Sequence, residues 1–519
     1  MSKRGAVAAG HPLTAEAGAA ILREGGNAVD AAVAAVLASF VTESPLTGLG
    51  AGGFMLVHTD AEDVLLDFFV EVPGRDGSGR RSELVPIPIY FAPDAPQVFN
   101  VGAASCGVPG TPAGLDAALR RFGSVARDEV VKAAVDHARR GVQVNPEQGF
   151  IFHILEPILT HTEEGRAIYA PRGQMLREGE VFRFPDLADA LERYGAEGPE
   201  PFYRGDIARR VSEWVLERGG TLAFADLAAY EPVSREPVRA SFRGREVLTN
   251  PPPSSGGILI AFCLDLLERL GAAGVDELVG TMEAAQAERT DQFLDGLYED
   301  GFVERFLTSP RLDAAAARLR ERLQSPGASA RKPGDSLGST THITAVDGEG
   351  RCASVTCSNG TGSGLVVPGT GIHVNNMLGE EDLNPLGFHR HPPGRRMPSM
   401  MSPTAILRDG ELEAGLGSGG SNRIRSAILQ TILRLVVEGM DVADAVVAPR
   451  LHFEAGVVQA EPGIDEQGLR SLEARGLGVA RWGELNLFFG GVHAVSRDPE
   501  TGELRGGGDP RRGGAIAIA

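Results

Sequence analysis

The sequence predicts an α+β or α/β protein whose last third is rich in strands and whose sheets carry helices on their outer faces. Three observations support this prediction. Helical patterns dominate residues 12–41 and 116–250. Residues 310–338 are charged and then loop-like, as is typical of an exposed segment open to cleavage. After residue 340, short alternating apolar runs are separated by turn residues.

The N-terminal segment predicts two helices followed by a pair of strands. Thr14 is a candidate N-cap of the first helix, and Gly25–Gly26 would end it. Asn27 is a candidate cap of the second helix, whose alanines and valines indicate close packing on a sheet. The runs "FMLVHT" and "DVLLDFFV" then predict a hairpin.

The C-terminal third predicts strands interrupted by one helix. "HITAVD", "CASVTCS", "PTAILRDG" and "GVHAVSRD" each read as a short strand. Residues 421–440 form an amphipathic pattern of helical period. No repeat of fixed period is present.

Composition excludes several classes of protein. The 519 residues are enough for a large core, and 42% of them are hydrophobic. The formal net charge of −19 repels phosphate backbones, so no nucleic-acid partner is expected. The N-terminus lacks the apolar core of an export signal, and residues 29–41 are too few to span a bilayer. A cytoplasmic protein without a membrane partner is therefore expected, with a trimmed export signal as the open alternative.

The four cysteines do not indicate a disulfide framework or a metal site. Cys352 and Cys357 lie five residues apart in a strand-like run, so they would point to opposite faces of the sheet. We expect these two, with Cys106 and Cys263, to be small core residues.

Two short motifs imitate ligand sites. "GLGAGG" at 48–53 has dinucleotide-binding spacing, but it follows a helix and opens a strand, which is the reverse of the required context. "HRH" at 389–391 has no carboxylate or cysteine nearby at ligand spacing and is surrounded by proline and arginine. We therefore expect a glycine turn and a surface loop, and neither a cofactor nor a metal.

Thr340 is the candidate that bears on catalysis. It stands with Thr341 where the loop-like run "GDSLGS" meets the strand "HITAVD". A threonine hydroxyl becomes a useful nucleophile when a base takes its proton, and the free α-amine of an N-terminal threonine is such a base. The α-amine has a pKa of about 7.7–8.0, near working pH. From these residues alone, two ordinary strand threonines of high β-propensity remain the better interpretation.

A family resemblance changes that balance. "STTHITAVDGEGRCASVTCSNG" closely resembles the processing site of the γ-glutamyltransferase (γ-glutamyltranspeptidase) family of N-terminal-nucleophile hydrolases. Further segments resemble the family and occur in the family's order over more than 400 residues. This shared order makes the resemblance strong evidence. The segments are "HPLTAEAGAAILREGGNAVDAAVAA", "GLGAGGFMLV", "GVPGTPAGL", "NPPPSSGG", "GIHVNNMLGEEDLNP", "MPSMMSPT", "GLGSGGSNRI" and "APRLH".

The resemblance implies a self-cleaving enzyme. The bond between Ser339 and Thr340 would be cut, leaving a large part of residues 1–339 and a small part of residues 340–519. The exposed linker 325–339 would precede the cut. Both parts would together form one four-layer αββα sandwich, so the cleaved fragment is itself a partner.

The resemblance also implies roles for individual residues. Thr340 would be the nucleophile, Gly419 and Gly420 would supply oxyanion-binding N–H groups, and Thr341 and Ser358 would support the nucleophile. Each such N–H donor can contribute roughly 3 kcal/mol to the transition state. The substrate-binding residues by this resemblance are Asn359, Glu380 and Ser399.

The chain departs from the family at the substrate site. Phe69 and Val70 stand where the family has an arginine that binds the α-carboxylate. Loss of a bidentate arginine removes the strongest contact to that group. Met377 replaces a Gln or Glu, and Met400 replaces a serine. Candidates to replace the missing cation are Arg75, Arg395 and Arg396.

Three functions remain open. The first is a γ-glutamyltransferase or glutathione hydrolase that passes the γ-glutamyl group of a small-molecule amide to water or an amine. The second is a related amidase or acylase for another acyl group, such as a glutaryl group. The third is an inactive binding homologue, against which the presence of Thr340, Gly419 and Gly420 argues.

Overall fold

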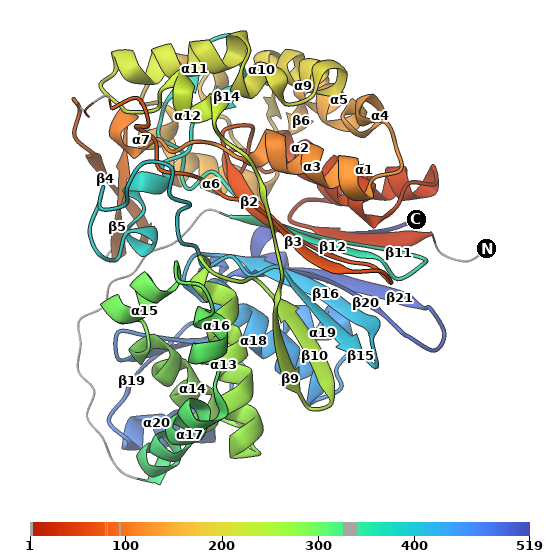
Figure 1. Ribbon diagram of the computed structural model, residues 1–519, viewed down its shortest axis with the longest axis vertical. Coiled ribbons are helices and arrows are strands. Elements are labelled where there is room, and N and C mark those ends of the chain that lie inside the picture. Colours follow the sequence, from red (N-terminus) through yellow and green to blue (C-terminus); the bar gives the residue numbers. More distant parts are fainter. Residues whose placement is uncertain (1–3, 78, 80, 93–94, 325–339) are drawn as a thin grey trace.

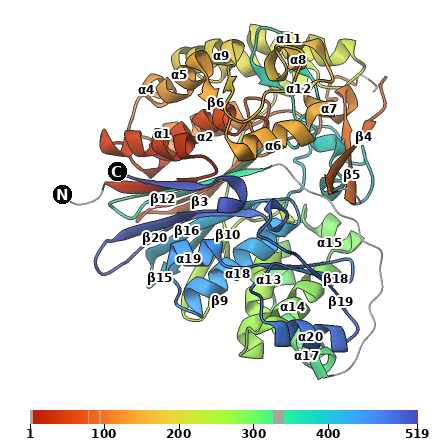
Figure 2. The ribbon, with the colours of Figure 1, turned by 180° about the vertical axis from the view of Figure 1, so that it is seen from behind.

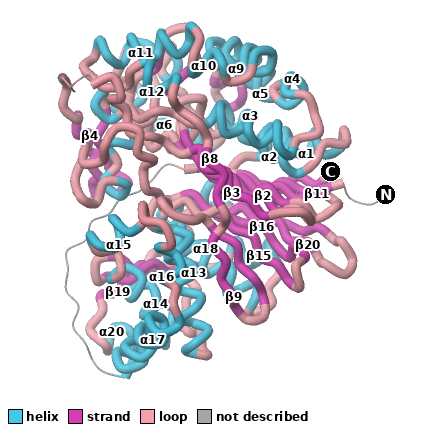
Figure 3. The backbone as a smooth tube through the Cα atoms, in the orientation of Figure 1, coloured by secondary structure: helices cyan, strands magenta, loops and turns pink. Residues whose placement is uncertain are grey.

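The computed structural model describes residues 4–77, 79, 81–92, 95–324 and 340–519. Figure 1 shows four layers, with helices above, two stacked sheets in the middle and helices below, and Figure 2 shows the same layers from behind. In Figure 3 the strands form the double central layer. The predicted α+β class and αββα sandwich are confirmed. The linker 325–339, with Ser339 of the predicted cleavage point, lies outside the described residues.

The first sheet has seven strands and draws on both ends of the chain. Its order is β22-β1-β11-β12-β2-β3-β8. In that order the strands are Ala515–Ile518, Gly5–Ala9, Thr341–Asp347, Cys352–Ser358, Gly52–His58, Asp63–Phe68 and Val233–Arg235. The strand β11 is central, because it pairs antiparallel with β1 on one side and with β12 on the other.

The second sheet has six strands, in the order β21-β20-β16-β15-β10-β9. These are Leu504–Gly508, Gly491–Arg497, Glu411–Gly419, Thr404–Arg408, Arg245–Thr249 and Val238–Phe242. The two sheets meet through buried polar groups as well as apolar ones. His342 bonds Thr344 and Thr356 within the first sheet, and the hydroxyl of Thr344 donates to the His493 carbonyl of the second.

Helices cover the outer face of each sheet. On the first sheet lie α1 Pro12–Arg23, α2 Ala28–Thr42, α3 Thr111–Phe122, α4 Arg127–Val130, α5 Lys132–Arg140, α6 Pro146–Ile154, α7 Glu156–Leu159, α8 Glu163–Tyr169, α9 Pro185–Glu197, α10 Glu200–Tyr203, α11 Asp206–Glu217 and α12 Phe224–Ala228. On the second lie α13 Ser255–Leu270, α14 Val275–Ala287, α15 Asp291–Gly296, α16 Phe302–Phe306, α17 Ser309–Gln324, α18 Arg423–Val436, α19 Val442–Val447 and α20 Glu466–Ala474.

Small sheets complete the described chain. They pair β4 Val85–Ala92 with β5 Ala95–Val101, β6 Val142–Gln143 with β7 Val181–Phe182, and β13 Val366–Val367 with β14 Ile372–His373, and they join β17 Leu451–Glu454, β18 Val457–Ala460 and β19 Gly478–Arg481.

The predicted helix caps have different outcomes. Asn27 caps α2 as expected, and its side chain accepts from the N–H groups of Val29 and Asp30. The prediction for Thr14 is wrong, because α1 begins at Pro12 and the His11 side chain accepts the first-turn N–H of Leu13. Proline suits the first helical position, so the helix starts before Thr14.

Other local predictions are confirmed. The strands β2 and β3 form the expected hairpin, and α18 falls within the predicted helix 421–440. The cysteines are free and buried, and Cys352 and Cys357 pack into different core clusters, as expected for opposite faces. In the glycine turn, a Cβ on Gly50 would lie 2.2 Å from the His373 carbonyl oxygen, so this turn serves close backbone approach.

The described residues contain no cluster of three or more His, Cys, Asp or Glu side chains able to hold a metal ion. Within the described ranges, none of the helices has the length and apolar character needed to cross a bilayer. The cytoplasmic location stays a prediction.

Replacing Asp30 by alanine should destabilise the upper half of the sandwich. Its fully buried carboxylate accepts from the backbone N–H groups of Asn27, Ser124 and Val125, at 3.0 to 3.2 Å. Each orphaned buried donor costs about 1–3 kcal/mol, so we expect a loss of about 3 kcal/mol or more in the free energy of unfolding. Urea denaturation measures it. The control Glu129→Ala removes a side chain that is 43% exposed and pairs with Lys132 at the surface, so it should change stability by less than about 0.5 kcal/mol. An equal effect of both variants would contradict the expectation.

Candidate active site

Thr340 lies at the head of the central strand β11 and is 5% exposed. Its carbonyl oxygen accepts a hydrogen bond from Nη1 of Arg512, at 3.4 Å. The same oxygen is packed against Gly419, where an added Cβ would lie only 2.2 Å away. The structure therefore brings the predicted nucleophile and the first predicted oxyanion glycine into direct contact.

The glycine element is a tight connection between β16 and α18. Gly420 has φ +121° and Ser421 has φ +53°, a region that favours glycine over other residues. Ser421 donates a hydrogen bond to Asp382, and the Asn422 amide donates to the same carboxylate at 3.0 Å. Asp382 thus holds the turn that follows the two glycines.

A small cavity of about 40 Å³ opens at Thr340, and it gathers most of the residues predicted to bind substrate. It is lined by Phe69, Thr340, Ser358, Gly360, Met377, Glu380, Asp382, Leu383, Ser399, Met400, Met401, Ser421 and Ile424.

The polar wall of the small cavity is rich in carboxylates. The amide of Asn376 donates to Oε1 of Glu380 at 2.9 Å. Burial raises the pKa of Glu380 to about 7, and the nearby Asp382 and Glu381 carboxylates add to the shift, while hydrogen bonds from Asn376 and the Thr361 backbone oppose it. Among the described residues, the lining contains no arginine or lysine. Outside the lining, the charge of Asp382 acts on Arg289 and Arg425.

Two of the other predicted positions also reach this cavity, and one does not. The Ser358 hydroxyl accepts from the N–H of Gly360, and the Ser399 hydroxyl accepts from the N–H of Met401. Asn359 is not among the residues lining the cavity. Its amide donates to the carbonyl of His373 at 3.2 Å, which turns it toward the strand β14.

The three arginines considered as replacements all lie outside the lining of the small cavity. Arg396 is buried over the Tyr230 ring, 4.7 Å from its centroid, and donates to the Phe69 carbonyl. Arg75 pairs with Glu71, and Arg395 stacks 4.4 Å from the ring centroid of Tyr298. The idea that one of them binds a substrate carboxylate is therefore not supported by their placement. Phe69, at the family's arginine position, instead contributes an apolar wall.

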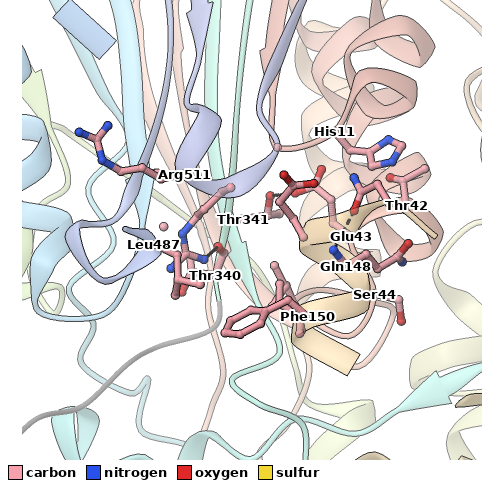
Figure 4. Close-up of a pocket in the computed structure, with 18 of the residues that line it drawn as sticks. His11, Thr42, Glu43, Ser44, Gln148, Phe150, Thr340, Thr341, Leu487 and Arg511 are labelled. Carbon is pink, nitrogen blue, oxygen red and sulfur yellow. Dashed lines mark hydrogen bonds between the residues drawn. The ribbon is translucent and has the colours of Figure 1, made fainter. Parts of the chain in front are cut away.

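A larger cavity of about 250 Å³ also opens at Thr340 (Figure 4). Its walls come from the start of α1, the end of α2, the start of α6 and the C-terminal strands. It is lined by Gly10, His11, Thr42, Glu43, Ser44, Leu46, Asn145, Pro146, Glu147, Gln148, Phe150, Ile151, Thr340, Thr341, Gly419, Leu487, Gly491, His493, Arg511 and Arg512.

Glu43 is the buried acid of the larger cavity. It accepts hydrogen bonds from the hydroxyls of Thr341 and Thr14, the latter at 2.8 Å. Burial raises the pKa of Glu43 to about 7, although the two hydroxyls and the charge of Arg512 act in the opposite direction. Thr341 is therefore bonded to the carboxylate at the end of α2.

Arg512 is a cation in contact with the candidate nucleophile, since its Nη1 donates to the Thr340 carbonyl. Burial lowers its pKa to about 10, and the charge of Arg423 adds to this shift. Beside it, Arg511 is bonded to Glu461 and Asp509, and Arg450 bonds Asp509 at 2.7 Å. This buried ionic cluster orients the C-terminal segment that carries Arg512.

Sequence reasoning missed Asp382, Ser421, Glu43 and Arg512. Asp382 stands two residues beyond Glu380 in "GEEDL", where the choice among acids could not be made without coordinates. The sequence could have indicated Glu43, because it is a lone acidic residue at the end of an apolar run. No local signal marks Arg512, which the last strands bring to Thr340.

The family profile described as Gamma-glutamyltranspeptidase matches residues 14–519. The chain belongs to this family. Its αββα sandwich and the predicted resemblance are therefore confirmed, and the protein is an enzyme of the hydrolase and acyltransferase type.

Known members of the gamma-glutamyltranspeptidase family resemble this chain over nearly its full length. It is 34% identical to the acylase ACY 1 proenzyme of Pseudomonas sp. (strain V22), over 97% of this chain and 91% of that protein. It is 32% identical to the glutathione hydrolase proenzyme of Escherichia coli (strain K12), over 98% of this chain and 91% of that protein.

Solved structures agree with the family assignment. The cephalosporin acylase from Bacillus halodurans superposes with a TM-score of 0.85 at 27% identity, covering 99% of this chain and 96% of that one. The gamma-glutamyltranspeptidase of Helicobacter pylori superposes with a TM-score of 0.53 at 27% identity, covering 60% of this chain and 90% of that one.

The raised pKa of Glu43 predicts a stability that depends on pH. Its pKa is about 7 in the folded protein and near 4.5 when unfolded, so the folded state binds the extra proton between these values. The contribution of Glu43 to the free energy of unfolding is therefore greatest below pH 4.5. It falls by up to about 3 kcal/mol as the pH rises to 7.

Glu43→Gln imitates the protonated acid, so its free energy of unfolding should lack the pH-dependent contribution of Glu43. Urea denaturation of both proteins from pH 5 to 8 should show the variant gaining stability relative to the native chain as pH rises. The exposed control Glu163→Gln should show no such trend. A constant difference between Glu43→Gln and the native chain at all pH values would refute the expectation.

Proposed function

We propose that the chain cleaves itself between Ser339 and Thr340 and then acts as an N-terminal-threonine amidohydrolase and acyltransferase. The observation that carries the proposal is the position of Thr340. It is buried at the head of a central strand, its carbonyl touches Gly419, and two cavities open beside it. Linkage to a preceding residue blocks its α-amine, so cleavage is required before that amine can act as a base.

The chemistry follows from these groups. In the precursor, the Thr340 hydroxyl attacks the Ser339 carbonyl, and the peptide C–N bond breaks to free the α-amine and leave an ester on Thr340 Oγ. Water hydrolyses that ester, which releases the Ser339 carboxylate and restores the hydroxyl. In the mature enzyme, that amine takes the hydroxyl proton as Oγ attacks a substrate amide. N–H groups of Gly419 and Gly420 stabilise the oxyanion. Collapse expels the amine with the proton and leaves an acyl ester, which water or an acceptor amine then cleaves.

The small cavity favours a γ-glutamyl group as the acyl part. Glu380 and Asp382 bring two carboxylates to this cavity, which suits the α-ammonium of a γ-glutamyl amide. The Ser399 hydroxyl lines the same cavity and can donate its proton to the α-carboxylate. A glutaryl group has the carboxylate but no ammonium, so the two acids would repel it. The proposed substrates are γ-glutamyl amides such as glutathione.

A second candidate is an acylase for a different acyl group. It is favoured by the missing arginine and by the apolar wall of Phe69, Met377 and Met400. The likeness to an acylase proenzyme and to a cephalosporin acylase supports the same candidate.

Self-cleavage predicts two fragments on a denaturing gel. The native chain should separate into parts of 339 and 180 residues, and Thr340→Ala should stay a single chain without amidase activity. Thr340→Ser keeps a hydroxyl and should still cleave, more slowly. A native chain that stays whole while it hydrolyses amides would overturn the role of Thr340.

The pKa of Glu380 predicts how acyl preference changes with pH. As pH rises through about 7, this buried acid ionises and attracts an α-ammonium more strongly. The ratio of kcat/KM for a γ-glutamyl anilide to that for a glutaryl anilide should therefore rise about tenfold between pH 6 and 8. The Thr340 amine acts on both substrates, so its titration cancels in the ratio.

Glu380→Gln should remove most of this rise and lower the ratio at pH 8 by about tenfold. The exposed variant Glu381→Gln, beside it in sequence, serves as the control and should retain the rise. A ratio below one at every pH would instead favour the acylase candidate.

A further inference from the structure

The N-cap residue of α18 does not cap its helix. Asn422 stands at that position, directly after Gly420 and Ser421, yet its side chain makes no hydrogen bond to the first turn. An asparagine there ordinarily accepts one of the free N–H groups of the first turn. Backbone bonds close the turn instead. The N–H of Arg423 donates to the Gly420 carbonyl, at 3.1 Å. The Asn422 side chain is therefore available for other contacts.

The Asn422 amide is the centre of a buried polar network. The residue is 3% exposed. Its Nδ2 donates to Oδ1 of Asp382 at 3.0 Å and to Oε1 of Glu454 at 2.9 Å. Its Oδ1 accepts from Nη1 of Arg289 at 3.3 Å. Both ends of the amide are thus engaged, and each partner is a charged group.

The network balances two acids against two arginines. Burial lowers the pKa of Arg289, and the charges of Asp382 and Glu454 act in the opposite direction. Burial also lowers the pKa of Arg425 to about 10, and the charge of Arg289 adds to this shift. Arg425 in turn donates to Oε1 of Gln286 at 3.2 Å. Removing one member of such a buried network leaves its partners without compensation, so the arrangement is rigid.

The network joins the two parts of the proposed cleaved chain. Gln286 lies on α14, and Arg289 lies in the connection from α14 to α15, both in residues 1–339. Asn422 and Arg425 belong to residues 340–519. Figure 1 places α14 and α18 in the same helical layer, on the outer face of the second sheet. The turn before α18 is therefore held from the large part as well as from the small one.

The network reaches the oxyanion glycines through Ser421. Its backbone has φ +53°, a conformation that is unfavourable for serine and persists where the surroundings hold it. Its hydroxyl donates to Asp382, the same carboxylate that accepts from Asn422. Gly419 and Gly420, which precede it, have wide conformational freedom of their own. Their orientation therefore depends on how firmly the next residues are fixed.

We propose that Asn422 and Arg289 are positioning residues that keep the N–H groups of Gly419 and Gly420 aimed at the developing oxyanion. This inference rests on the proposed catalysis by Thr340. The arginine holds the asparagine amide, and the amide holds the carboxylate that fixes the serine after the two glycines. Donors held in place in this way stabilise the new charge without reorienting as it forms.

Two substitutions test the network in the cleaved enzyme. Asn422→Ala removes the central amide and should lower kcat about thirtyfold, part of the roughly hundredfold or more that loss of a whole oxyanion donor costs. Arg289→Met removes one outer partner and should lower kcat about tenfold. KM should change less than about threefold in both, because the bound substrate has no oxyanion yet. Acylation and deacylation both pass through an oxyanion, so the loss appears whichever step limits kcat.

The double variant separates positioning from general damage. If both residues act through the one amide, Arg289→Met should cost nothing further once Asn422 is replaced. The double variant should then match Asn422→Ala within about twofold. Arg289→Lys keeps a charged donor for the single bond and should recover most of kcat.

Arg311→Met is the matched control. It removes the same charge from a side chain that is 44% exposed and pairs with Glu288, next to Arg289 in the chain. It should leave kcat within about twofold of the native value. All rates are measured with the γ-glutamyl and glutaryl anilides, and the cleaved enzyme is counted from the two bands of a denaturing gel.

Two outcomes would overturn the inference. One is a kcat that stays at the native value in both single variants, or a loss that appears in KM or in the γ-glutamyl to glutaryl ratio instead, since it would assign the network to acyl binding. The other is independent, multiplying losses in the double variant. Should Asn422→Ala fail to fold or to cleave itself, Arg289→Met and Arg289→Lys still decide, because equal kcat in these two would refute a role for the charged donor. Failure of the proposed function is distinguishable, since the native enzyme would then give no turnover.

Discussion

The position of Thr340 depends on the hydrogen-bond ladder of β11. This strand pairs with β12 from Thr341 to Val346 and with β1 from Thr344 to Asp347. A strand bonded on both edges keeps its place when the covalent link before it is removed. The proposed new N-terminus would therefore stay in register with Gly419 without a tether. The other residues of the candidate site are placed relative to Thr340.

Close contact between the sheets extends this constraint to the second layer. A Cβ on Gly417 would lie 2.2 Å from the His342 ring, and one on Gly415 would lie 2.4 Å from the Cys352 sulfur. Glycine at these positions lets β16 approach β11 and β12. The hydroxyl of Ser354 donates across the gap to the Leu416 carbonyl. Packing at this distance sets Gly419, at the end of β16, against the Thr340 carbonyl.

Charge is distributed unequally around the nucleophile. Glu380 and Asp382 occupy one cavity and Glu43 the other, whereas Arg512 lies by the Thr340 carbonyl. Burial raises the pKa of Glu380 and of Glu43 to about 7, so both acids are costly to ionise. An ammonium group in the small cavity would offset that cost for Glu380.

The sequence by itself determined the fold class, the helices α1, α2 and α18, the strands around Thr340 and the family. These follow from local periodicity and from collinear motifs, both of which are properties of neighbouring residues. It also indicated Thr340, Gly419, Glu380 and Ser399, because each stands in a motif. It could not indicate that Asp382 reaches the cavity beside Glu380, nor that Asn359 turns toward His373.

Only the tertiary structure decided the rest. Arg512 and Glu43 lie 469 positions apart in a chain of 519 residues, and the pairing of β1 with β11 and β22 brings both ends together. The pKa of Glu43 depends on burial, which no local pattern encodes. Arg396 looked available in sequence, but Tyr230 and the Phe69 carbonyl hold it away from the cavity. Cavities exist between elements, so their walls appear only when distant segments pack.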